Sequence, residues 1–493
     1  MALPVKNTNE DTIAAAATAM TEAGIGIIRV SGPEAFSACD RIFRNAAGKR
    51  ALLSYAANTI HFGHIVDPES PAEAAKQMNI VDEVMISVMK SPHSYTTEDT
   101  VEINSHGGVY VMNRILQLVL DQGVRLAEPG EFTKRAFFGG RIDLAEAEAV
   151  MDMISSQNEF AMKTAARQMT GEVSSKICSL RERVLHELAF IEAAIDDPEN
   201  YDTESYPEIL HTAVAGLIEE MDALLLYADD SRIIKEGVRT AIIGRPNAGK
   251  SSLMNYLVGS ERAIVTEIAG TTRDTLEESV RIGGALLHLT DTAGIRETED
   301  IVEQIGVGRA RQAIEDADLV IFVIDASLPL SAEEKEIAEA MEKALHRGAK
   351  GIVLLNKSDL VKSELALRET EKEAMDLFHA NKNSKISSPL FLSASLLTGS
   401  GMGLLKEEIL RLFHVGELKE RNEPYLVSRR HAEAVSNARR SLDLVRQSIE
   451  AGLSEDFYSI DLMNCYAELG KILGEQVEDD LAEEIFSKFC LGK

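Results

Sequence analysis

The sequence predicts a multidomain fold: a small α+β domain, an all-α region in two halves, and an α/β domain inserted between those halves. The chain has 493 residues, which is too long for a single hydrophobic core. Apolar runs alternate with amphipathic helical segments from Val238 to about Phe413, a pattern typical of a doubly wound parallel sheet. Helical patterning precedes and follows this stretch, so the α/β domain interrupts a helical region.

The N-terminal region mixes short strand-like runs with turns. Its glycine-bounded or apolar runs favour strands at Gly24–Gly32, Val81–Met89 and Val101–Asn104. The apolar spacing over Val109–Leu120 is that of a helix. We therefore expect residues 1–125 to form the α+β domain.

The next region, residues 126–235, is rich in Ala, Glu, Met and Gln, which favour helices. Apolar residues recur on one face of a helix at Leu180, Val184, Leu188, Ile191 and Ile195. The acidic segment Asp196–Pro207 interrupts this pattern, which then resumes to about Tyr227. These residues are expected to form the first half of the helical region.

Residues 236–414 carry the strand–helix alternation, and residues 415–493 become helical again after Pro424. The expected strands are Val238–Ile243, Leu286–Leu289, Leu319–Asp325, Gly351–Leu355 and Pro389–Leu392. Neither helical half shows an obvious partner within itself, so we expect the two to pack together. Two separate helical units would give the same pattern.

Charge and cysteine usage narrow the class of protein. The net charge of −29, from 80 acidic and 51 basic residues, argues against broad binding to nucleic acid or anionic membranes, although a local basic patch stays open. The four cysteines are scattered, which disfavours structural zinc or a disulfide framework. No apolar run approaches the roughly 20 residues of a membrane helix. We expect a cytoplasmic protein with no membrane association.

The motif Gly244-Arg-Pro-Asn-Ala-Gly249-Lys250-Ser251 follows the expected strand Val238–Ile243 and precedes a helical pattern. This is the strand–loop–helix context of a phosphate-binding loop, in which backbone N–H groups surround the phosphates. Lys250 would reach the β- and γ-phosphates, and Ser251 would bind Mg²⁺. The inserted domain is therefore expected to be a Ras-like P-loop domain.

Three further segments follow strands in the order found in GTP-binding domains. Asp291-Thr-Ala-Gly294 can hold Mg²⁺ through water and meet the γ-phosphate. Asn356-Lys357-Ser-Asp359 supplies a carboxylate that can accept the two N–H donors of guanine, which adenine lacks. Ser393-Ala394-Ser395 can offer a backbone N–H to the guanine oxygen. Together they predict a GTP site.

The position after Gly294 is Ile295, where Ras-like proteins carry a glutamine that orients the attacking water. An isoleucine cannot orient water. We therefore expect a substitute within Arg296–Glu303 or in a partner, and the sequence assigns no arginine finger.

With these motifs in view, nearly the whole chain resembles the MnmE (TrmE) family of bacterial tRNA-modification GTPases. The residues that carry the resemblance include Asp11-Thr-Ile-Ala, Gly26-Ile-Ile-Arg-Val-Ser-Gly32, Ser94-Tyr-Thr-Thr-Glu-Asp99, His106-Gly-Gly108, Pro129–Phe137, Asp143–Glu148, Gly244–Ser252, Gly270-Thr-Thr-Arg-Asp274 and Phe489-Cys-Leu-Gly-Lys493. The outer motifs separate this family from other G proteins with the same loop.

The resemblance implies a tetrahydrofolate-binding and dimerisation domain at residues 1–125. It implies a helical domain in two halves, 126–235 and 415–493, and an inserted G domain at 236–414. It also implies a homodimer that works with the flavoprotein MnmG in a heterotetramer or larger complex. The pair would install a carboxymethylaminomethyl or aminomethyl group on the wobble uridine of tRNA, with a tetrahydrofolate derivative as one-carbon carrier and tRNA held mainly through the complex.

Carried over by motif, the resemblance assigns residues to the nucleotide and its ions. The K⁺ ligands would be the Asn247 side chain and the carbonyls of Thr266, Ile268 and Thr271, with Ser251 and Thr272 at Mg²⁺. Glu303 would orient the water and Lys250 would assist catalysis, although Glu303 also suits a solvated helix face. The GTP contacts would be Asn247, Ala248, Gly249, Lys250, Ser251, Ser252, Thr266, Glu267, Ile268, Ala269, Gly270, Thr271, Thr272, Asp291, Thr292, Ala293, Gly294, Asn356, Lys357, Asp359, Ser393, Ala394 and Ser395.

The resemblance also implies a folate site, made by Arg29, Glu102, Arg141 and Lys493. Basic side chains suit the glutamate tail of a folate, and a carboxylate can accept hydrogen bonds from the pterin edge. Ordinary surface ion pairs are the alternative for these residues. Cys490 would lie near the folate as a catalytic residue, or would be a plain buried cysteine. His106, before two glycines, favours fixing a turn over taking part in chemistry.

Two functions from different classes fit these features. The first is a potassium-activated GTPase coupled to uridine modification. The second is a regulatory G protein that binds RNA or the ribosome without base chemistry. The outer residues Arg29, Glu102 and Phe489–Lys493 favour the first, because a simple switch has no use for them.

Overall fold

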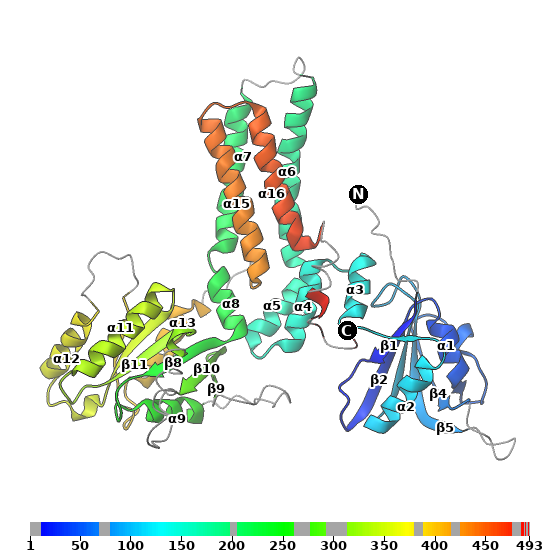
Figure 1. Cartoon of the computed structure of the whole chain (residues 1–493), viewed down its shortest axis with the longest axis horizontal. Coiled ribbons are helices and arrows are strands. Elements are labelled where there is room, and N and C mark those ends of the chain that lie inside the picture. Colours follow the sequence, from blue (N-terminus) through cyan, green and yellow to red (C-terminus); the bar gives the residue numbers. More distant parts are fainter. Residues whose placement is uncertain are drawn as a thin grey trace, which may run out of the picture. The chain divides into compact units, whose positions relative to one another are not determined.

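The computed structural model describes residues 11–68, 79–197, 205–260, 277–291, 313–378, 388–415, 424–475, 485–487, 489 and 492. The chain divides into two compact units, each built from separate stretches of sequence. The first contains Met1–Met151, Gln168–Leu210 and Arg440–Lys493, and the second contains Asp152–Arg167 and His211–Arg439. The predicted multidomain class, with an α+β domain, helices and an α/β domain, is confirmed (Figure 1).

The α+β part of the first unit is built on a seven-stranded sheet in the order β3-β4-β5-β6-β2-β1-β7. The strands are β1 (Ile13–Ala16), β2 (Ala23–Ser31), β3 (Phe43–Asn45), β4 (Thr59–Val66), β5 (Ile80–Met89), β6 (Thr100–Gly107) and β7 (Arg125–Leu126). All neighbours pair antiparallel except β1 and β7. The three predicted strands and the predicted helix, α2 (Val109–Leu120), are confirmed.

Alternation along the strands separates a core face from a second face of this sheet. Ile28 and Val30 of β2 pack with helices α1 (Ala35–Ile42) and α2 in one apolar cluster. Arg29 lies between them in sequence and so points to the other face, where it stands opposite Glu102 of β6 in the register. Two predicted site residues are therefore placed side by side by strand pairing alone.

The long helix α6 (Glu172–Asp196) packs against α16 (Glu455–Leu473) within the first unit. Leu180, Val184, Leu188 and Ile191 are buried as predicted, but Ile195 is 46% exposed. Ile195 lies in the last turn of α6, where the buried face continues through Ala194 instead. The remaining α-helices of the predicted helical halves, within the described residues, are α3 (Glu131–Phe138), α4 (Leu144–Ser155), α5 (Glu159–Met169), α7 (Tyr206–Leu225), α8 (Ala228–Glu236) and α15 (Arg429–Glu450).

The second unit holds a six-stranded sheet in the order β13-β12-β11-β8-β10-β9. The first five are parallel, as predicted: β8 (Val238–Ile243), β10 (Ala285–Asp291), β11 (Leu319–Asp325), β12 (Lys350–Asn356) and β13 (Leu390–Ser393). The sequence did not predict one edge strand, β9 (Glu277–Ile282), which pairs antiparallel with β10. Gly283 and Gly284, at φ +56° and +98°, form the two-residue turn between β9 and β10. Hairpin turns of this type need positive φ at both central residues, which glycine allows.

Helices cover both faces of this sheet. Side chains on both faces of its strands are therefore buried, which is why the strand sequences are continuous apolar runs. On one face α9 (Lys250–Ser260) and α13 (Met402–Leu412) pack with Ile321 and Val323 of β11. On the other, α11 (Ala332–His346) and α12 (Glu364–Asp376) pack with Val320, Phe322 and Ile324. The carboxyl ends of β8, β11, β12 and β13 consequently open at one edge, where ligands bind in such folds.

Candidate nucleotide site and a second polar site

The phosphate loop after β8 contains three residues with positive φ: Gly244 (+147°), Asn247 (+63°) and Gly249 (+111°). A Cβ atom on Gly244 would lie 2.3 Å from the Val323 carbonyl oxygen, and one on Gly249 would lie 2.2 Å from Asn356 Nδ2. A side chain at either position would clash with a neighbouring atom and would strain the backbone, so both positions need glycine. Asn247 tolerates the left-handed region better than most residues do.

Lys250 reaches back across the loop. Its Nζ donates to the carbonyl oxygens of Gly244 at 2.7 Å and Arg245 at 2.8 Å. Ser251 and Ser252 follow it in the first turn of α9 and are exposed. The amino end of α9 thus presents a lysine, two hydroxyls and its free N–H groups together, which is an arrangement suited to phosphate and Mg²⁺.

Asn356 joins the phosphate loop to the loop after β13. Its Nδ2 donates to the Ala248 carbonyl at 2.8 Å, and its Oδ1 accepts from the Leu396 N–H at 3.2 Å. The residue is 3% exposed, so these bonds are shielded from water. Asn356 therefore holds two parts of the site together, besides any contact with a nucleotide.

Lys357 is tied to the end of β11. It has φ +61°, and its Nζ lies 2.6 Å from Asp325 Oδ2. Burial by itself raises the pKa of Asp325, but hydrogen bonds from Lys357 and Ser327 outweigh it and hold the pKa below the usual 3.8. The ion pair fixes the Lys357 side chain along the site.

The predicted guanine-binding residues differ in availability. Asp359 is exposed and lines the pocket. The N–H groups of Ala394 and Ser395 are already bonded to the carbonyls of Leu355 (2.9 Å) and Ser400 (3.0 Å). Leu396 and Leu397, which the sequence prediction missed, line the pocket instead of Ser393–Ser395.

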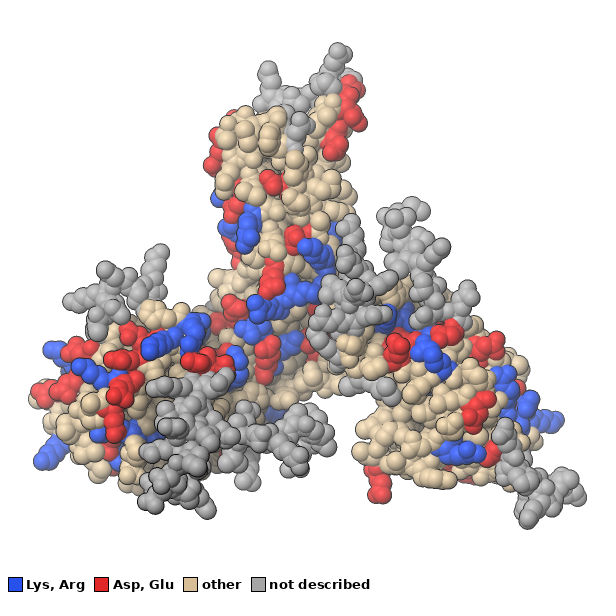
Figure 2. All heavy atoms as spheres, viewed as in Figure 1, with Lys and Arg blue, Asp and Glu red and all other residues tan. Residues whose placement is uncertain are grey.

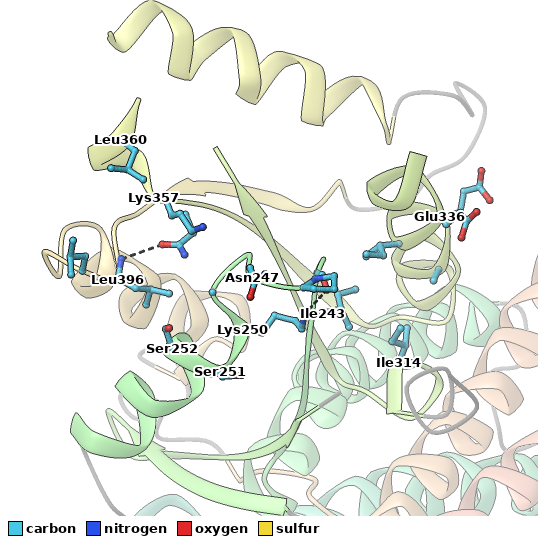
Figure 3. A pocket seen from close by; sticks show the side chains of 18 of the residues that line it. Ile243, Asn247, Lys250, Ser251, Ser252, Ile314, Glu336, Lys357, Leu360 and Leu396 are labelled. Carbon is cyan, nitrogen blue, oxygen red and sulfur yellow. Dashed lines mark hydrogen bonds between the residues drawn. The ribbon is translucent and has the colours of Figure 1, made fainter. Parts of the chain in front are cut away.

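These residues surround a pocket of about 1600 Å³ at the carboxyl edge of the sheet. Figure 3 shows Asn247, Lys250 and Ser251 on the phosphate loop and α9, and Lys357, Leu360 and Leu396 on the neighbouring loops. The structure therefore brings together Asn247, Gly249, Lys250, Ser251, Ser252, Asn356, Lys357 and Asp359. The size of the pocket and its mixture of glycines, cations and carboxylates suit a nucleotide.

Part of the predicted site lies outside the described residues, and of Asp291 only the backbone at the end of β10 is described. The predictions left outside are Thr266, Glu267, Ile268, Ala269, Gly270, Thr271, Thr272, Thr292, Ala293, Gly294, Glu303, Cys490 and Lys493.

The first unit contains a second polar site, on the face of its sheet opposite α1 and α2. The Arg29 guanidinium binds Glu102 Oε1 through Nε at 2.9 Å and Nη2 at 2.8 Å. It also lies over the Tyr95 ring at 5.4 Å and the Phe132 ring at 5.6 Å. Arg29 and Glu102 are only 16% and 22% exposed, so this is a partly desolvated ion pair.

Arg141 approaches the same Tyr95 ring from another direction. Its guanidinium lies 4.8 Å from the ring centroid and donates to the Tyr95 carbonyl at 3.1 Å. Near the other end of the chain, Gly492 packs on Ala16, and its carbonyl accepts from Arg29 Nη1 at 3.4 Å. Two of the four predicted folate residues, Arg29 and Arg141, thus lie over Tyr95, and a third, Glu102, pairs with Arg29. The sequence prediction gave Tyr95 no role.

A buried network fixes the Tyr95 loop. Arg135, with a side chain 3% exposed, binds Glu98 at 3.1 Å, Glu131 at 3.0 Å and Asp11 at 2.7 Å. Burial raises the pKa of Glu131, but Arg125, the Glu128 N–H and Arg135 together hold it below its usual 4.5. His106 takes no part here: it lies in β6, 71% exposed, with Nδ1 2.7 Å from Asp82.

The family models cover both units. The model described as the TrmE N-terminus of a GTP-binding protein matches residues 12–141, and the MnmE helical domain matches residues 144–490. The chain belongs to the MnmE family of tRNA modification GTPases. It is accordingly a GTP hydrolase.

Curated MnmE relatives match over nearly their whole length. The tRNA modification GTPase MnmE of Lachnoclostridium phytofermentans is 46% identical over 98% of this chain and 99% of its own. That of Bacillus subtilis is 44% identical over 98% of this chain and 100% of its own. Among solved structures, Aquifex aeolicus Era bound to GDP and AlF4⁻ is 26% identical over 42% of this chain and 66% of its own, with a TM-score of 0.28.

Proposed function

We propose that this MnmE-family GTPase modifies the wobble uridine of tRNA together with the flavoprotein MnmG, using a one-carbon unit carried by tetrahydrofolate. The observation that supports this best is that Arg29 and Arg141 both lie over the Tyr95 ring while Glu102 pairs with Arg29. Two guanidinium groups and an aromatic ring suit the anionic tail and the flat ring of a folate, while Glu102 can accept from its amino edge. Lys493 and Cys490 complete the proposed site from the C-terminal segment, whose Gly492 already contacts Arg29.

Reduced-folate binding to the intact protein tests this proposal. We expect calorimetry to show binding to the wild type, and Arg141→Ala to weaken it at least roughly tenfold, because a charged contact is lost. Lys134→Ala, which removes a nearby cation outside the Tyr95 cluster, is the matched control and should bind normally. An intact protein that binds no reduced folate would refute the modification chemistry while leaving GTP hydrolysis untouched.

The nucleotide site is proposed to use Mg²⁺ at Ser251 and Thr272, and K⁺ at Asn247 and the carbonyls of Thr266, Ile268 and Thr271. Asn247 supports this, because its exposed side chain lies in the pocket on a strained, left-handed backbone. A cation there would neutralise developing charge between the phosphates, as an arginine finger does. Glu303 is proposed to orient the water in place of Ile295.

GTP turnover in different monovalent salts tests the cation. Turnover should be at least roughly tenfold slower in sodium than in potassium, since only an ion of suitable size and coordination fills the Asn247 site. Asn247→Ala should lose the difference between the two salts while still binding GDP. Equal rates in sodium and potassium for the wild type would exclude the potassium mechanism.

The proposed assembly is a homodimer that joins MnmG in a heterotetramer or larger complex in the cytoplasm. An apolar strip on the first unit's sheet supports a self-contact. Ile60, Phe62 and Met85 are 63%, 48% and 44% exposed on the face that α1 and α2 leave uncovered. Phe62 and Met85 stand opposite one another across β4 and β5, so the strip is continuous.

A further inference from the structure

The second residue of the phosphate loop does not point into the pocket. Gly244, Pro246, Asn247 and Gly249 line the pocket, but Arg245 between them is not among its lining residues. The Arg245 guanidinium instead forms an ion pair, through Nε, with Glu334 Oε1 in the first turn of α11. The pair connects the phosphate loop to the helix that follows β11.

Glu334 is a buried carboxylate with two separate tasks. Its side chain is 1% exposed. Oε2 accepts from the Ser331 N–H at 2.8 Å and from the Ser331 hydroxyl at 2.5 Å. The bond from the Ser331 N–H, together with the Ser331 side chain accepting from the Glu334 N–H, makes the capping box of α11. Oε1 has no hydrogen-bond partner within the described part of the chain, so the charge of Arg245 is what offsets its burial.

The loop needs restraint because Asn247, two residues beyond Arg245, holds an unfavourable left-handed conformation. Lys250 and Asn356 restrain it through backbone carbonyls, those of Gly244, Arg245 and Ala248. The contact with α11 differs, because it is made by a loop side chain, Arg245, and not by the backbone. The Arg245 guanidinium offsets the charge of the buried Glu334 carboxylate, so separating the two would leave that carboxylate buried without a counter-charge. Loss of either partner would therefore free the loop from α11.

We propose that Arg245 and Glu334 are a positioning pair for GTP binding and hydrolysis. They hold the phosphate loop in its binding conformation and do not touch the nucleotide. The capping box is a separate function of Glu334, carried by the other oxygen. This separation makes the proposal testable, because each oxygen can be addressed by its own variant.

The experiment compares nucleotide affinity, kcat and KM with thermal stability in the full chain. Arg245→Gln removes the guanidinium charge, and Glu334→Gln removes the carboxylate charge while keeping a side chain that completes a capping box. We expect each to weaken GDP and GTP binding by roughly tenfold, and the double variant to be no weaker than either single one. Arg245→Lys, which keeps the charge, should restore most of the affinity.

Ser331→Ala is the matched control, since it disturbs the cap and leaves the ion pair. It should lower the unfolding temperature and keep wild-type nucleotide affinity. The proposal is overturned if Arg245→Gln and Glu334→Gln bind nucleotide like the wild type, if their losses multiply in the double variant, or if Ser331→Ala weakens binding equally. If Arg245→Gln does not fold, the comparison is made with Glu334→Gln and Arg245→Lys. Weaker binding by Glu334→Gln with near-normal binding by Arg245→Lys supports the proposal, and wild-type binding by Glu334→Gln overturns it.

Discussion

At the scale of single residues, several residues of the nucleotide site are held in place by contacts with one another. Gly249 is packed against Asn356, Asn356 bridges Ala248 and Leu396, and Lys357 is paired with Asp325. Asp359 differs, because its carboxylate is exposed to the pocket. It is therefore the residue best placed to distinguish one base from another.

Asp359→Asn should change the base that the protein prefers. An amide in place of the carboxylate exchanges an acceptor for a donor, which suits the ring N–H and carbonyl pattern of xanthine and opposes that of guanine. We expect the ratio of GDP to XDP affinity to fall by on the order of a hundredfold. Competition binding with both nucleotides measures it. Asp376→Asn, an exposed acid at the end of α12, is the control, and an unchanged ratio in Asp359→Asn would contradict the guanine assignment.

The sequence predicted the two strands that carry Arg29 and Glu102, and the family resemblance assigned both residues to one site. Their pairing across β2 and β6 was not predicted and comes from the structure. The sequence was not enough to single out Tyr95 and Phe132. Their role depends on where α3 and the loop before β6 pack, which is a tertiary property without a local signature. The bond that occupies the Ala394 N–H is likewise set by the β12–β13 register, and the bond that occupies the Ser395 N–H is set by an isolated bridge with Ser400.

At the scale of elements, the parallel strands were predictable from continuous apolar runs, whereas β9 was not. Its residues Glu277–Ile282 alternate in character as an edge strand does, and the two glycines after it were the available signal. Ile195, by contrast, was predicted to be buried and is exposed in the structure. Helical periodicity gives the direction of a side chain, but the end of the neighbouring surface decides whether the last turn of α6 is covered.

The network around helix α3 should make the first unit sensitive to acid. The pKa of Glu131 is held below 4.5 in the folded protein, so its stabilising effect is present above that pH and is lost as pH falls further. Arg125→Gln removes the largest of the lowering contacts and should cost about 2 kcal/mol at neutral pH. Burial then raises the pKa of Glu131, so the difference between variant and wild type should shrink as the pH falls below 4.5.

Calorimetric unfolding of both proteins between about pH 7 and pH 3.5 measures this difference. Arg50→Gln changes an exposed arginine of the same domain outside the network and is the control. A constant difference in unfolding temperature across this range would mean that the Glu131 charge contributes nothing to folding.

At the scale of the whole molecule, the net charge of −29 constrains how tRNA is held. Lys and Arg side chains in Figure 2 are interspersed with Asp and Glu over the visible surface. Several cations are also engaged in ion pairs, among them Arg239 with Asp318 and Arg439 with Asp222. No helix within the described ranges is long and apolar enough to span a membrane.

The chain alone should therefore bind tRNA weakly and with a shallow dependence on salt. Each phosphate contact releases counterions, so a strongly acidic protein that makes few such contacts loses little affinity when salt rises from about 50 to 200 mM. The proposed partner, MnmG, is expected to supply most phosphate contacts, so the complex should bind more tightly and with a steeper salt slope than this chain does. Titration of labelled tRNA with the chain, with MnmG and with both, at several salt concentrations, separates these contributions. Tight, salt-steep binding by the isolated chain would place the tRNA on this protein instead.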